Sequence, residues 1–204
     1  HQGIEVCGGK LVRAGSEEAV TTEDILAKIT DRTAAVVHFL GKQSRTQLGE
    51  VIDGCQDAGV PVIVDAAAQL PPRSNLLEIV DMGASLVNFS GGKGLRGPQS
   101  SGLVLGKKDY VDAVRMNASP NSGMGRGMKV GKEEILGLVT AVDVFLKGSD
   151  GDDRTAWESQ ASCVVQALKD CPGVTGAVLG EGQPAAPEFA PRAYITFEDP
   201  DRIG

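Results

Sequence analysis

Metal ligands and basic charge are scarce in this sequence. Its 204 residues include only two histidines, and the four cysteines, Cys7, Cys55, Cys163 and Cys171, form no CxxC pair. We therefore expect no zinc site, and we interpret the cysteines as small buried hydrophobic residues in a reducing compartment. The formal net charge of -7 argues against a general nucleic-acid-binding surface, which would need clustered lysine and arginine.

Long apolar runs and a signal peptide are also missing. No segment reaches the roughly 20 apolar residues of a membrane-spanning helix, so we expect a cytoplasmic protein without a membrane partner. The chain begins with His1 rather than methionine, and we expect the native N-terminus, with any targeting signal, to lie upstream. With 41% hydrophobic and 23% charged residues, the composition is typical of a globular protein with one good core.

Short β-rich runs alternate with amphipathic stretches, which predicts an α/β fold with a mostly parallel sheet flanked by helices. Thr21 is a candidate helix N-cap that accepts from the Asp24 amide, and Gly59 is a candidate C-terminal cap. We expect helices at 21–29, 46–58, 76–82, 109–116, 130–147 and 154–169, and strands at 34–40, 60–64, 84–89, 101–105, 174–179 and 192–197.

The domain organisation follows from two interruptions in this pattern. Residues 117–128 are rich in Gly, Ser, Asn and Pro, which predicts a loop. Residues 148–153 are polar, which predicts a break between two helices. Between them lies the helix at 130–147, which we expect to be the longest. We predict part of a large domain at 1–128, a connecting helix at 129–148 and the start of a small α+β C-terminal domain, incomplete, at 149–204.

A glycine-rich turn carries one lysine, Lys93, directly after an apolar run. Residues 92–97 match the dinucleotide-binding pattern GxGxxG, but Pro98 and a β-rich run follow where that pattern needs a helix. The P-loop pattern GxxxxGK[ST] fails at two of its fixed positions. We therefore reject both kinds of nucleotide site.

A third interpretation is a lysine that forms a Schiff base with an aldehyde cofactor. Glycines on both sides of Lys93 leave room for a flat ring, and Ser90 offers a hydroxyl to a cofactor phosphate. Asp65 ends another apolar run 28 positions upstream, and an aspartate can keep a pyridine nitrogen protonated. Taken singly, Lys93 reads as a solvated loop lysine and Asp65 as a helix cap. Taken together, they indicate pyridoxal 5′-phosphate.

Three segments carry a resemblance to a known family: VPVIVDAAAQLPP at 60–72, GASLVNFSGGKGLRGPQSSGLVLGKKD at 83–109 and GRGMKVGKEEI at 125–135. In order and spacing they resemble the fold type I pyridoxal phosphate enzymes, which have the aspartate aminotransferase-type fold. Within these, the chain is similar to the selenocysteine synthase (L-seryl-tRNA selenium transferase) group and to relatives such as D-glucosaminate 6-phosphate ammonia-lyase. The resemblance covers about residues 10–147, and it implies that 1–128 is the C-terminal part of the cofactor-binding domain.

The resemblance implies roles for individual residues. Lys93 would be the Schiff-base lysine, Asp65 the pyridinium partner and Ser90 a contact of the cofactor phosphate. Ala67 would lie against the ring face, and residues 97–100 resemble the family's GPQ turn. Weaker candidates for contacts with a substrate phosphate or carboxylate are Arg96, Arg126, Lys129 and Lys132.

The resemblance also implies what is missing. The family's main phosphate-binding turn and its ring-stacking residue lie upstream of residue 1, so we expect a fragment that does not hold the cofactor or turn over by itself. Ala66, Ala67 and Ala68 stand where the selenocysteine synthase pattern has a glycine and a serine. This difference and the acidic charge favour the sugar-acid ammonia-lyase branch and make tRNA a less favoured partner.

The expected function is α,β-elimination from, or β-replacement on, an amino acid or amino sugar acid. Lys93 would act as the base at the α-carbon. The resemblance to the family also implies a homodimer or larger homo-oligomer. Two alternatives stay open. One is a class V-type aminotransferase or a sulfur-transferring relative on the same fold, and the other is a non-catalytic, degenerate domain.

Overall fold

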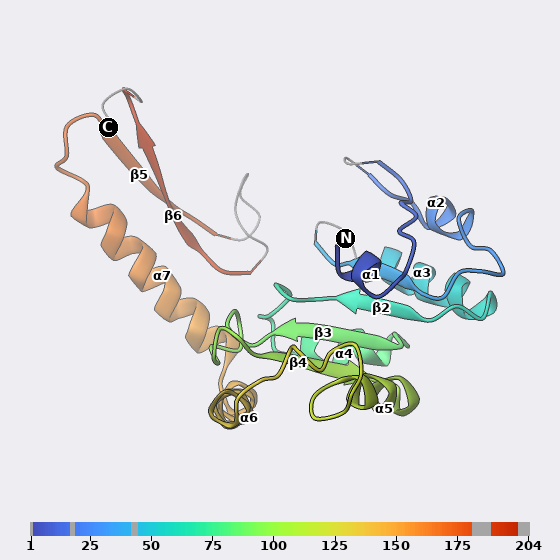
Figure 1. Cartoon of the computed structure of the whole chain (residues 1–204). Helices are drawn as coiled ribbons and strands as arrows, with labels where there is room; N and C mark the ends of the chain where they lie inside the picture. Colours follow the sequence, from blue (N-terminus) through green and yellow to red (C-terminus); the bar gives the residue numbers. More distant parts are fainter. Residues whose placement is uncertain (1, 17–18, 42–44, 181–188, 200–204) are drawn as a thin grey trace. The chain divides into compact units, whose positions relative to one another are not determined.

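The computed structural model describes residues 2–16, 19–41, 45–180 and 189–199 (Figure 1). Its elements in chain order are α1 (Gln2–Val6), α2 (Thr22–Leu26), β1 (Val36–Phe39), α3 (Arg45–Asp57), β2 (Val62–Asp65), α4 (Asn75–Asp81), β3 (Leu86–Ser90), β4 (Gly102–Gly106), α5 (Lys108–Asn117), α6 (Lys132–Lys147), α7 (Asp150–Ala167), β5 (Val174–Leu179) and β6 (Arg192–Phe197). They form two compact units, His1–Leu70 with Ser74–Asp143, and Pro71–Arg73 with Val144–Gly204. The domain bounds expected from the sequence stay a prediction.

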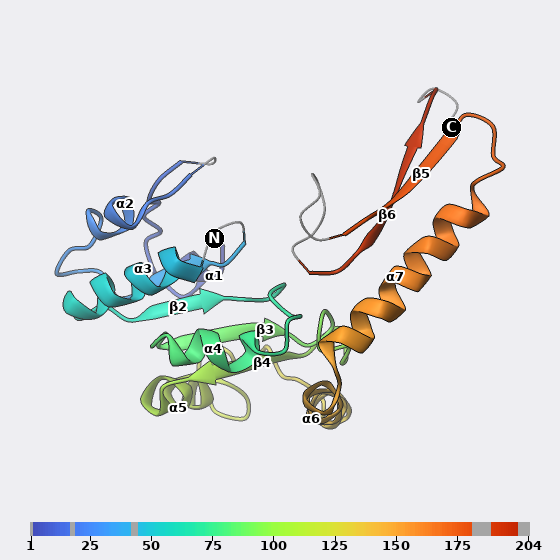
Figure 2. The same cartoon turned by 180° about the vertical axis from the view of Figure 1, so that it is seen from behind.

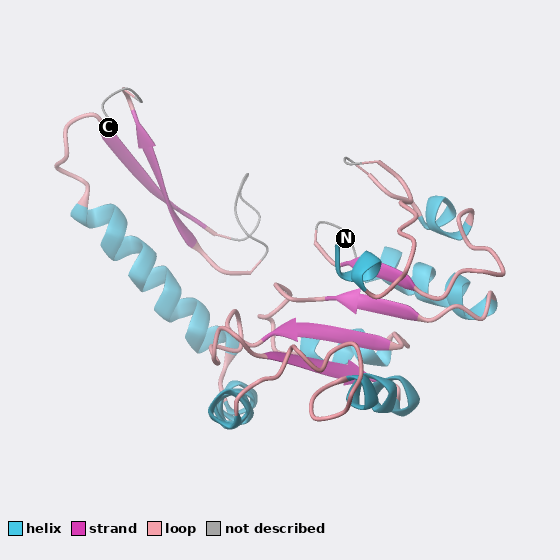
Figure 3. Cartoon of the chain, in the orientation of Figure 1, coloured by secondary structure: helices cyan, strands magenta, loops and turns pink. Residues whose placement is uncertain are grey.

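The first unit is built on a sheet with the strand order β1-β2-β3-β4 (Figure 3). Strands β1, β2 and β3 are parallel, and β4 pairs antiparallel with β3. The predicted α/β fold with a mostly parallel sheet is therefore confirmed. Because the first three strands run in the same direction, the residues at their carboxyl ends lie along one edge of the sheet.

The two faces of this sheet differ in polarity. Helices α3 and α4 lie on the same face of the sheet (Figures 1 and 2). Val62, Val64, Val87 and Phe89 are buried and share one face by their register and alternation. The register puts Phe39, Asp65 and Asn88 side by side on the other face, where Phe39 is 53% exposed. The helices add a row of buried apolar residues to the core: Leu48, Val51, Ile52, Cys55, Leu76 and Ile79.

The predicted helix caps are confirmed. Thr21 Oγ1 accepts a hydrogen bond from the Asp24 amide at 3.1 Å, and Asp24 Oδ2 accepts one from the Thr21 amide at 3.0 Å. Each side chain thus satisfies an amide that the first turn leaves unpaired. Gly59 follows α3 with φ of 70°, a conformation that glycine adopts without steric cost.

The second unit departs from the prediction at its first helix. Helix α7 begins at Asp150, because Ser149 Oγ accepts a hydrogen bond from the Asp152 amide at 3.3 Å and so caps it. Residues expected to form a polar break therefore form the first turn of α7. Their negative charges lie at the positive end of the helix dipole, where they stabilise the helix. With 18 residues α7 is longer than α6, which has 16, so the prediction of the longest helix is wrong. Helix α1 was not predicted.

The cysteines also depart from the prediction. Cys55 is buried in α3, and burial raises the pKa of its thiol. Cys7, Cys163 and Cys171 are exposed, so the interpretation of all four as buried is wrong. Four free thiols are present.

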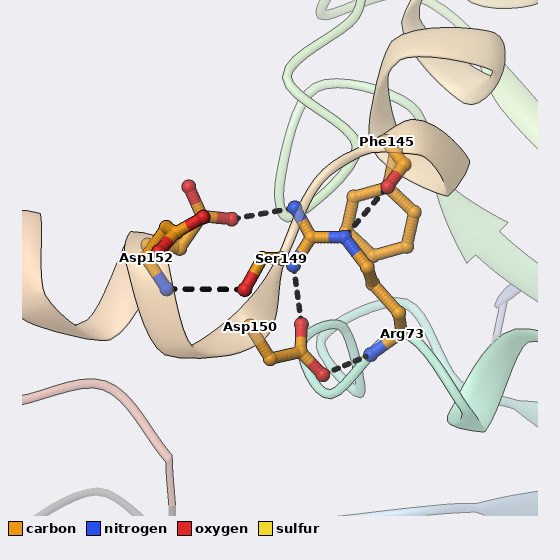
Figure 4. A network of polar contacts seen from close by, with 6 residues as sticks. Arg73, Phe145, Ser149, Asp150 and Asp152 are labelled. Atoms are coloured by element: carbon orange, nitrogen blue, oxygen red, sulfur yellow. Dashed lines mark hydrogen bonds and ion pairs between the residues drawn. The ribbon is translucent and has the colours of Figure 1, made fainter.

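Helix α7 packs along the antiparallel pair β5-β6, and a half-buried network joins its first turn to the segment Pro71–Arg73 of the same unit (Figure 4). Arg73 Nη2 pairs with Asp153 Oδ2 at 2.8 Å, and Arg73 Nη1 pairs with Asp150. Arg73 Nε donates to the Phe145 carbonyl at 2.6 Å, and the guanidinium carbon lies 4.8 Å from the centre of the Phe145 ring. Burial lowers the pKa of Arg73, but the hydrogen bonds to Asp153 and Asp150 raise it above its ordinary value.

None of the described helices combines the length and the apolar character that crossing a membrane requires.

Candidate cofactor site

Asp65 is the last residue of β2, at the carboxyl edge of the sheet. Its carboxylate oxygen Oδ1 accepts two hydrogen bonds, from the Ala67 amide at 3.0 Å and from Asn88 Nδ2 at 3.2 Å. Its carbonyl accepts the Leu40 amide at 3.0 Å, which ties the end of β2 to the end of β1. The side chain is half-buried, so both a protein contact and a ligand contact are available to it.

Lys93 lies in the turn that follows β3, three residues after Ser90. The turn is closed by the Gly97 amide, which donates to the Gly91 carbonyl at 2.7 Å, and by the Arg96 amide, which donates to the Lys93 carbonyl at 2.9 Å. The Lys93 side chain is exposed, and its ammonium group forms no hydrogen bond or ion pair with the residues that the structure describes. A fixed backbone therefore presents an unpaired amine.

Glycines are sterically required in this turn. A Cβ atom at Gly91 would lie 2.1 Å from Ser101 Oγ, and one at Gly94 would lie 2.2 Å from the Leu70 carbonyl oxygen. At Gly92 a Cβ atom would lie 2.7 Å from Gln99 Cα, and Gln99 Nε2 donates to the Gly92 carbonyl at 3.1 Å. The lysine is thus held between two closely packed glycines rather than in a loose loop.

The segment after Asp65 is fixed by its own hydrogen bonds. Gln69 Nε2 donates to the Leu40 carbonyl at 2.5 Å, and the buried Asn75 donates from Nδ2 to the Gln69 carbonyl at 2.6 Å. The next residue, Leu70, is the one whose carbonyl lies against Gly94. Backbone contacts therefore connect the aspartate segment with the lysine turn.

Most of the chain matches a family model. The model for L-seryl-tRNA selenium transferase matches residues 4–154. The chain belongs to the L-seryl-tRNA selenium transferase family.

Similar proteins include enzymes with other names. D-glucosaminate-6-phosphate ammonia lyase of Salmonella typhimurium is 29% identical over 175 residues, which are 84% of this chain and 44% of that protein. 5′-C-glycyluridine monooxygenase-decarboxylase of a Streptomyces species is 38% identical over 146 residues, which are 69% of this chain and 35% of that protein. The chain thus spans less than half the length of these relatives.

A solved structure of an enzyme with the same name as the first relative has a similar fold. The structure of D-glucosaminate-6-phosphate ammonia-lyase superposes with a TM-score of 0.71 and 26% identity, over 93% of this chain and 48% of that one. The fold is that of the fold type I pyridoxal phosphate enzymes, as the resemblance of the sequence to this family implied.

The residues present in this member of the selenium transferase family fit pyridoxal 5′-phosphate. Asp65 keeps one carboxylate oxygen, Oδ2, without a hydrogen bond among the described residues, and Lys93 offers an unpaired amine. The register places Ser90, two residues beyond Asn88, on the same face of the sheet as Asp65. The glycine turn keeps Lys93 at the carboxyl edge of the sheet, because a side chain at Gly91, Gly92 or Gly94 would clash with its neighbours.

The arginine and lysine candidates do not join this group. Arg96 lies in the lysine turn with φ of 57°, and its side chain is exposed. Arg126 lies in the 117–128 loop and donates from Nη1 to Ser119 Oγ at 3.0 Å. No described contact links Arg126, Lys129 or Lys132 to Asp65 or Lys93, and all three are exposed.

Sequence reasoning missed two polar residues next to the site. In the sequence Asn88 stands inside an apolar run and was interpreted only as part of a strand. Its spacing of two from Ser90 places both side chains on one face of that strand. Gln69 was read as part of a small-residue segment, and no pattern in the sequence points to its bond with Leu40.

Proposed function

We propose that the whole protein is a pyridoxal 5′-phosphate enzyme that acts on an amino acid or amino sugar acid, by α,β-elimination or by β-replacement. The supporting observation is that the two candidate residues lie at the carboxyl ends of neighbouring parallel strands. Asp65 ends β2, Lys93 follows the end of the neighbouring parallel strand β3, and backbone packing at Gly94 joins the two segments. Activity belongs to the whole protein, since the chain covers less than half of its relatives.

The roles follow from the chemistry of each side chain. Bound pyridoxal phosphate supplies an electron sink for negative charge at the substrate α-carbon. Lys93 Nζ would hold the cofactor, and its amine would be the base that takes the proton from the substrate α-carbon. Asp65 Oδ2 would hold the ring N–H, Ser90 would donate its hydroxyl to the phosphate, and Ala67 would present a small apolar side chain to the ring.

Elimination is the favoured branch. The three consecutive alanines after Asp65 differ from the selenocysteine synthase pattern, and the ammonia lyase relative aligns over 84% of the chain. The net charge of -7 makes tRNA the less favoured partner. The substrate is then a small molecule, an amino acid or an amino sugar acid, with Arg96 or Arg126 available for its phosphate or carboxylate.

We also propose a homodimer or a larger homo-oligomer. Several large apolar side chains of the first unit are exposed in α6 and in the loop before it, with Leu136 69% and Met128 77% exposed. A patch of this kind is typical of a protein–protein interface. Light scattering of the whole protein should give at least a dimer, and Leu136→Glu should shift it toward the monomer; a monomeric wild type would contradict this part of the proposal.

The cofactor is tested by absorption. The complete gene product incubated with pyridoxal phosphate should show the visible band of a lysine-bound cofactor, and Lys93→Ala should abolish it. Lys107→Ala, which removes an exposed lysine that is not in the turn, should leave it unchanged. Absence of the band in the wild type would favour the degenerate, non-catalytic domain.

The reaction is tested with a panel of amino acids and phosphorylated amino sugar acids. Release of ammonia with pyruvate or a keto-deoxy sugar acid would support elimination. Stoichiometric conversion of the cofactor to its amine form would indicate an aminotransferase instead. Because the Streptomyces relative is named a monooxygenase-decarboxylase, oxygen uptake and carbon dioxide release should be measured as well; either would overturn the elimination assignment.

A further inference from the structure

Asn88 and Asp65 are direct neighbours across two parallel strands. They are register partners in β3 and β2, and their side chains lie on the same face of the sheet. Asn88 Nδ2 lies 3.2 Å from Asp65 Oδ1, which is the long end of the hydrogen-bond range. A carboxylate can only accept, so the amide nitrogen of Asn88 must face it.

Both hydrogen bonds of the Asp65 carboxylate fall on the same oxygen. Oδ1 accepts from the Ala67 amide and from Asn88, whereas Oδ2 accepts none from the described residues. Rotation of a carboxylate about its terminal bond is otherwise broad and roughly two-fold. Two donors on one oxygen restrict this rotation and keep the other oxygen available.

We infer that Asn88 is a positioning residue for the cofactor, an inference that rests on the proposed function. Its amide fixes the Asp65 carboxylate so that Oδ2 receives the ring N–H of pyridoxal phosphate. The donor also stabilises the negative charge of the carboxylate, so the ring proton stays on the ring nitrogen. Asn88 touches the reacting atoms only through Asp65.

The chemical type of the residue supports this role. A lysine or arginine at position 88 would form an ion pair with Asp65 and compete with the ring nitrogen for its charge. An aspartate would place a second carboxylate beside the first, and an apolar residue would leave Oδ1 with one donor. A neutral amide holds the carboxylate in place and leaves its charge for the cofactor.

The test compares Asn88→Leu and Asn88→Asp in the complete gene product. Leucine has nearly the shape of asparagine without the donor, and aspartate keeps the shape but replaces the donor by an acceptor. Cofactor affinity, measured from the visible band, should fall about tenfold in Asn88→Leu, and roughly tenfold further in Asn88→Asp because like charges repel. A purely structural role predicts lower thermal stability in both variants, without a change in the ring-nitrogen shift at saturating cofactor.

A second readout reports on the proton itself. With cofactor labelled with ¹⁵N in the ring, the nitrogen shift of the wild type should be that of a protonated pyridine. In Asn88→Leu it should move toward the value of neutral pyridine. Val104→Ala is the matched control, because Val104 is the register partner of Asn88 on the other side and touches neither bond of Asp65; it should leave affinity and shift unchanged.

The outcomes separate the two proposals. If the wild type shows no band that depends on Lys93, the proposed function fails. If the wild type binds the cofactor normally and both Asn88 variants keep its affinity and its nitrogen shift, the function stands and the role of Asn88 is overturned. Thermal unfolding of each cofactor-free variant shows whether it is folded, and the ¹⁵N shift at saturating cofactor remains decisive if one variant is less stable.

Discussion

Gly94 packs directly against Leu70: a Cβ atom at position 94 would lie 2.2 Å from the Leu70 carbonyl oxygen. This contact joins the lysine turn to the segment that follows Asp65. Because the near atom is backbone, it cannot swing aside as the end of a flexible side chain would. The spacing between the two halves of the candidate site therefore depends on the absence of a side chain at this position.

Gly94→Ala should separate the lysine turn from the aspartate segment. We expect a loss of about 1–3 kcal/mol in the free energy of unfolding, as for other overpacked sites, together with weaker cofactor binding. Denaturant unfolding and titration of the visible band measure the two effects. Gly49→Ala is the control, because Gly49 lies in α3 with nothing within 4 Å of its added Cβ, and alanine there should be neutral or stabilising. Equal behaviour of the two variants would contradict the steric explanation.

Ser90→Ala should weaken the binding of pyridoxal phosphate about tenfold, since it removes one hydrogen bond to a charged group. The binding of pyridoxal, which lacks the phosphate, should not change. Ser100→Ala, which removes a serine that donates to Glu134, serves as the control. A loss of affinity for both ligands would show that Ser90 acts on the fold rather than on the phosphate.

Arg73→Ala should destabilise the second unit by about 1–3 kcal/mol, because it removes the guanidinium that pairs with Asp150 and Asp153 in a half-buried site. Arg73→Lys keeps the charge but loses the planar fork, and it should recover only part of the stability. Arg154 is unsuitable as a control, because it has interactions of its own. Arg115→Ala, in α5, removes an exposed arginine instead and should change the unfolding midpoint little. An unchanged midpoint in Arg73→Ala would refute the importance of the network.

His38 should make the stability of the fold depend on pH. Burial lowers the pKa of its imidazole below the ordinary 6.5, and Nε2 has no hydrogen-bond partner among the described residues. Below about pH 6.5 the unfolded chain therefore binds a proton that the folded chain does not, so stability is fully present above this pH and falls as the pH drops toward the folded pKa.

The measurement is the urea midpoint at pH 7.5 and at pH 5.5. The wild type should lose stability between these values, and His38→Leu should lose less. Asp24→Asn cannot replace His38→Leu in this comparison. The pKa of Asp24 is lowered, chiefly by the hydrogen bond from the Thr21 backbone amide, so Asp24 titrates in a more acidic range. The same pH dependence in wild type and His38→Leu would assign the effect to another group.

Much of the fold could be predicted from local pattern. The positions of β2 and β3 follow from apolar runs to within two residues. The start of α2 and the end of α3 follow from Thr21 and Gly59, because capping depends on side chains a few residues apart. The start of α7 could not be predicted in the same way. Its first turn is polar on every side, and Arg73, 77 residues before Asp150, supplies part of what stabilises it.

Lys93, Asp65 and Ser90 could be predicted as site residues because they follow or end apolar runs, whereas the role of Ala67 follows only from the resemblance to the family. Their roles stay predictions that the experiments above can test. Asn88 could not be predicted as a site residue, because an asparagine inside a strand does not by itself indicate a function. Its bond to Asp65 exists only because two strands 23 residues apart lie in one register.

The α/β alternation, the two strand ends with their aspartate and lysine, and the family can be read from the amino-acid sequence, because they depend on residue type and on spacing along the chain. Three features follow from the folded arrangement alone: which carboxylate oxygen of Asp65 stays available, why glycine is required at position 94, and that Arg73 holds the first turn of α7. Those features are contacts between distant segments. Their geometry is set by strand register and by packing, which no local pattern encodes.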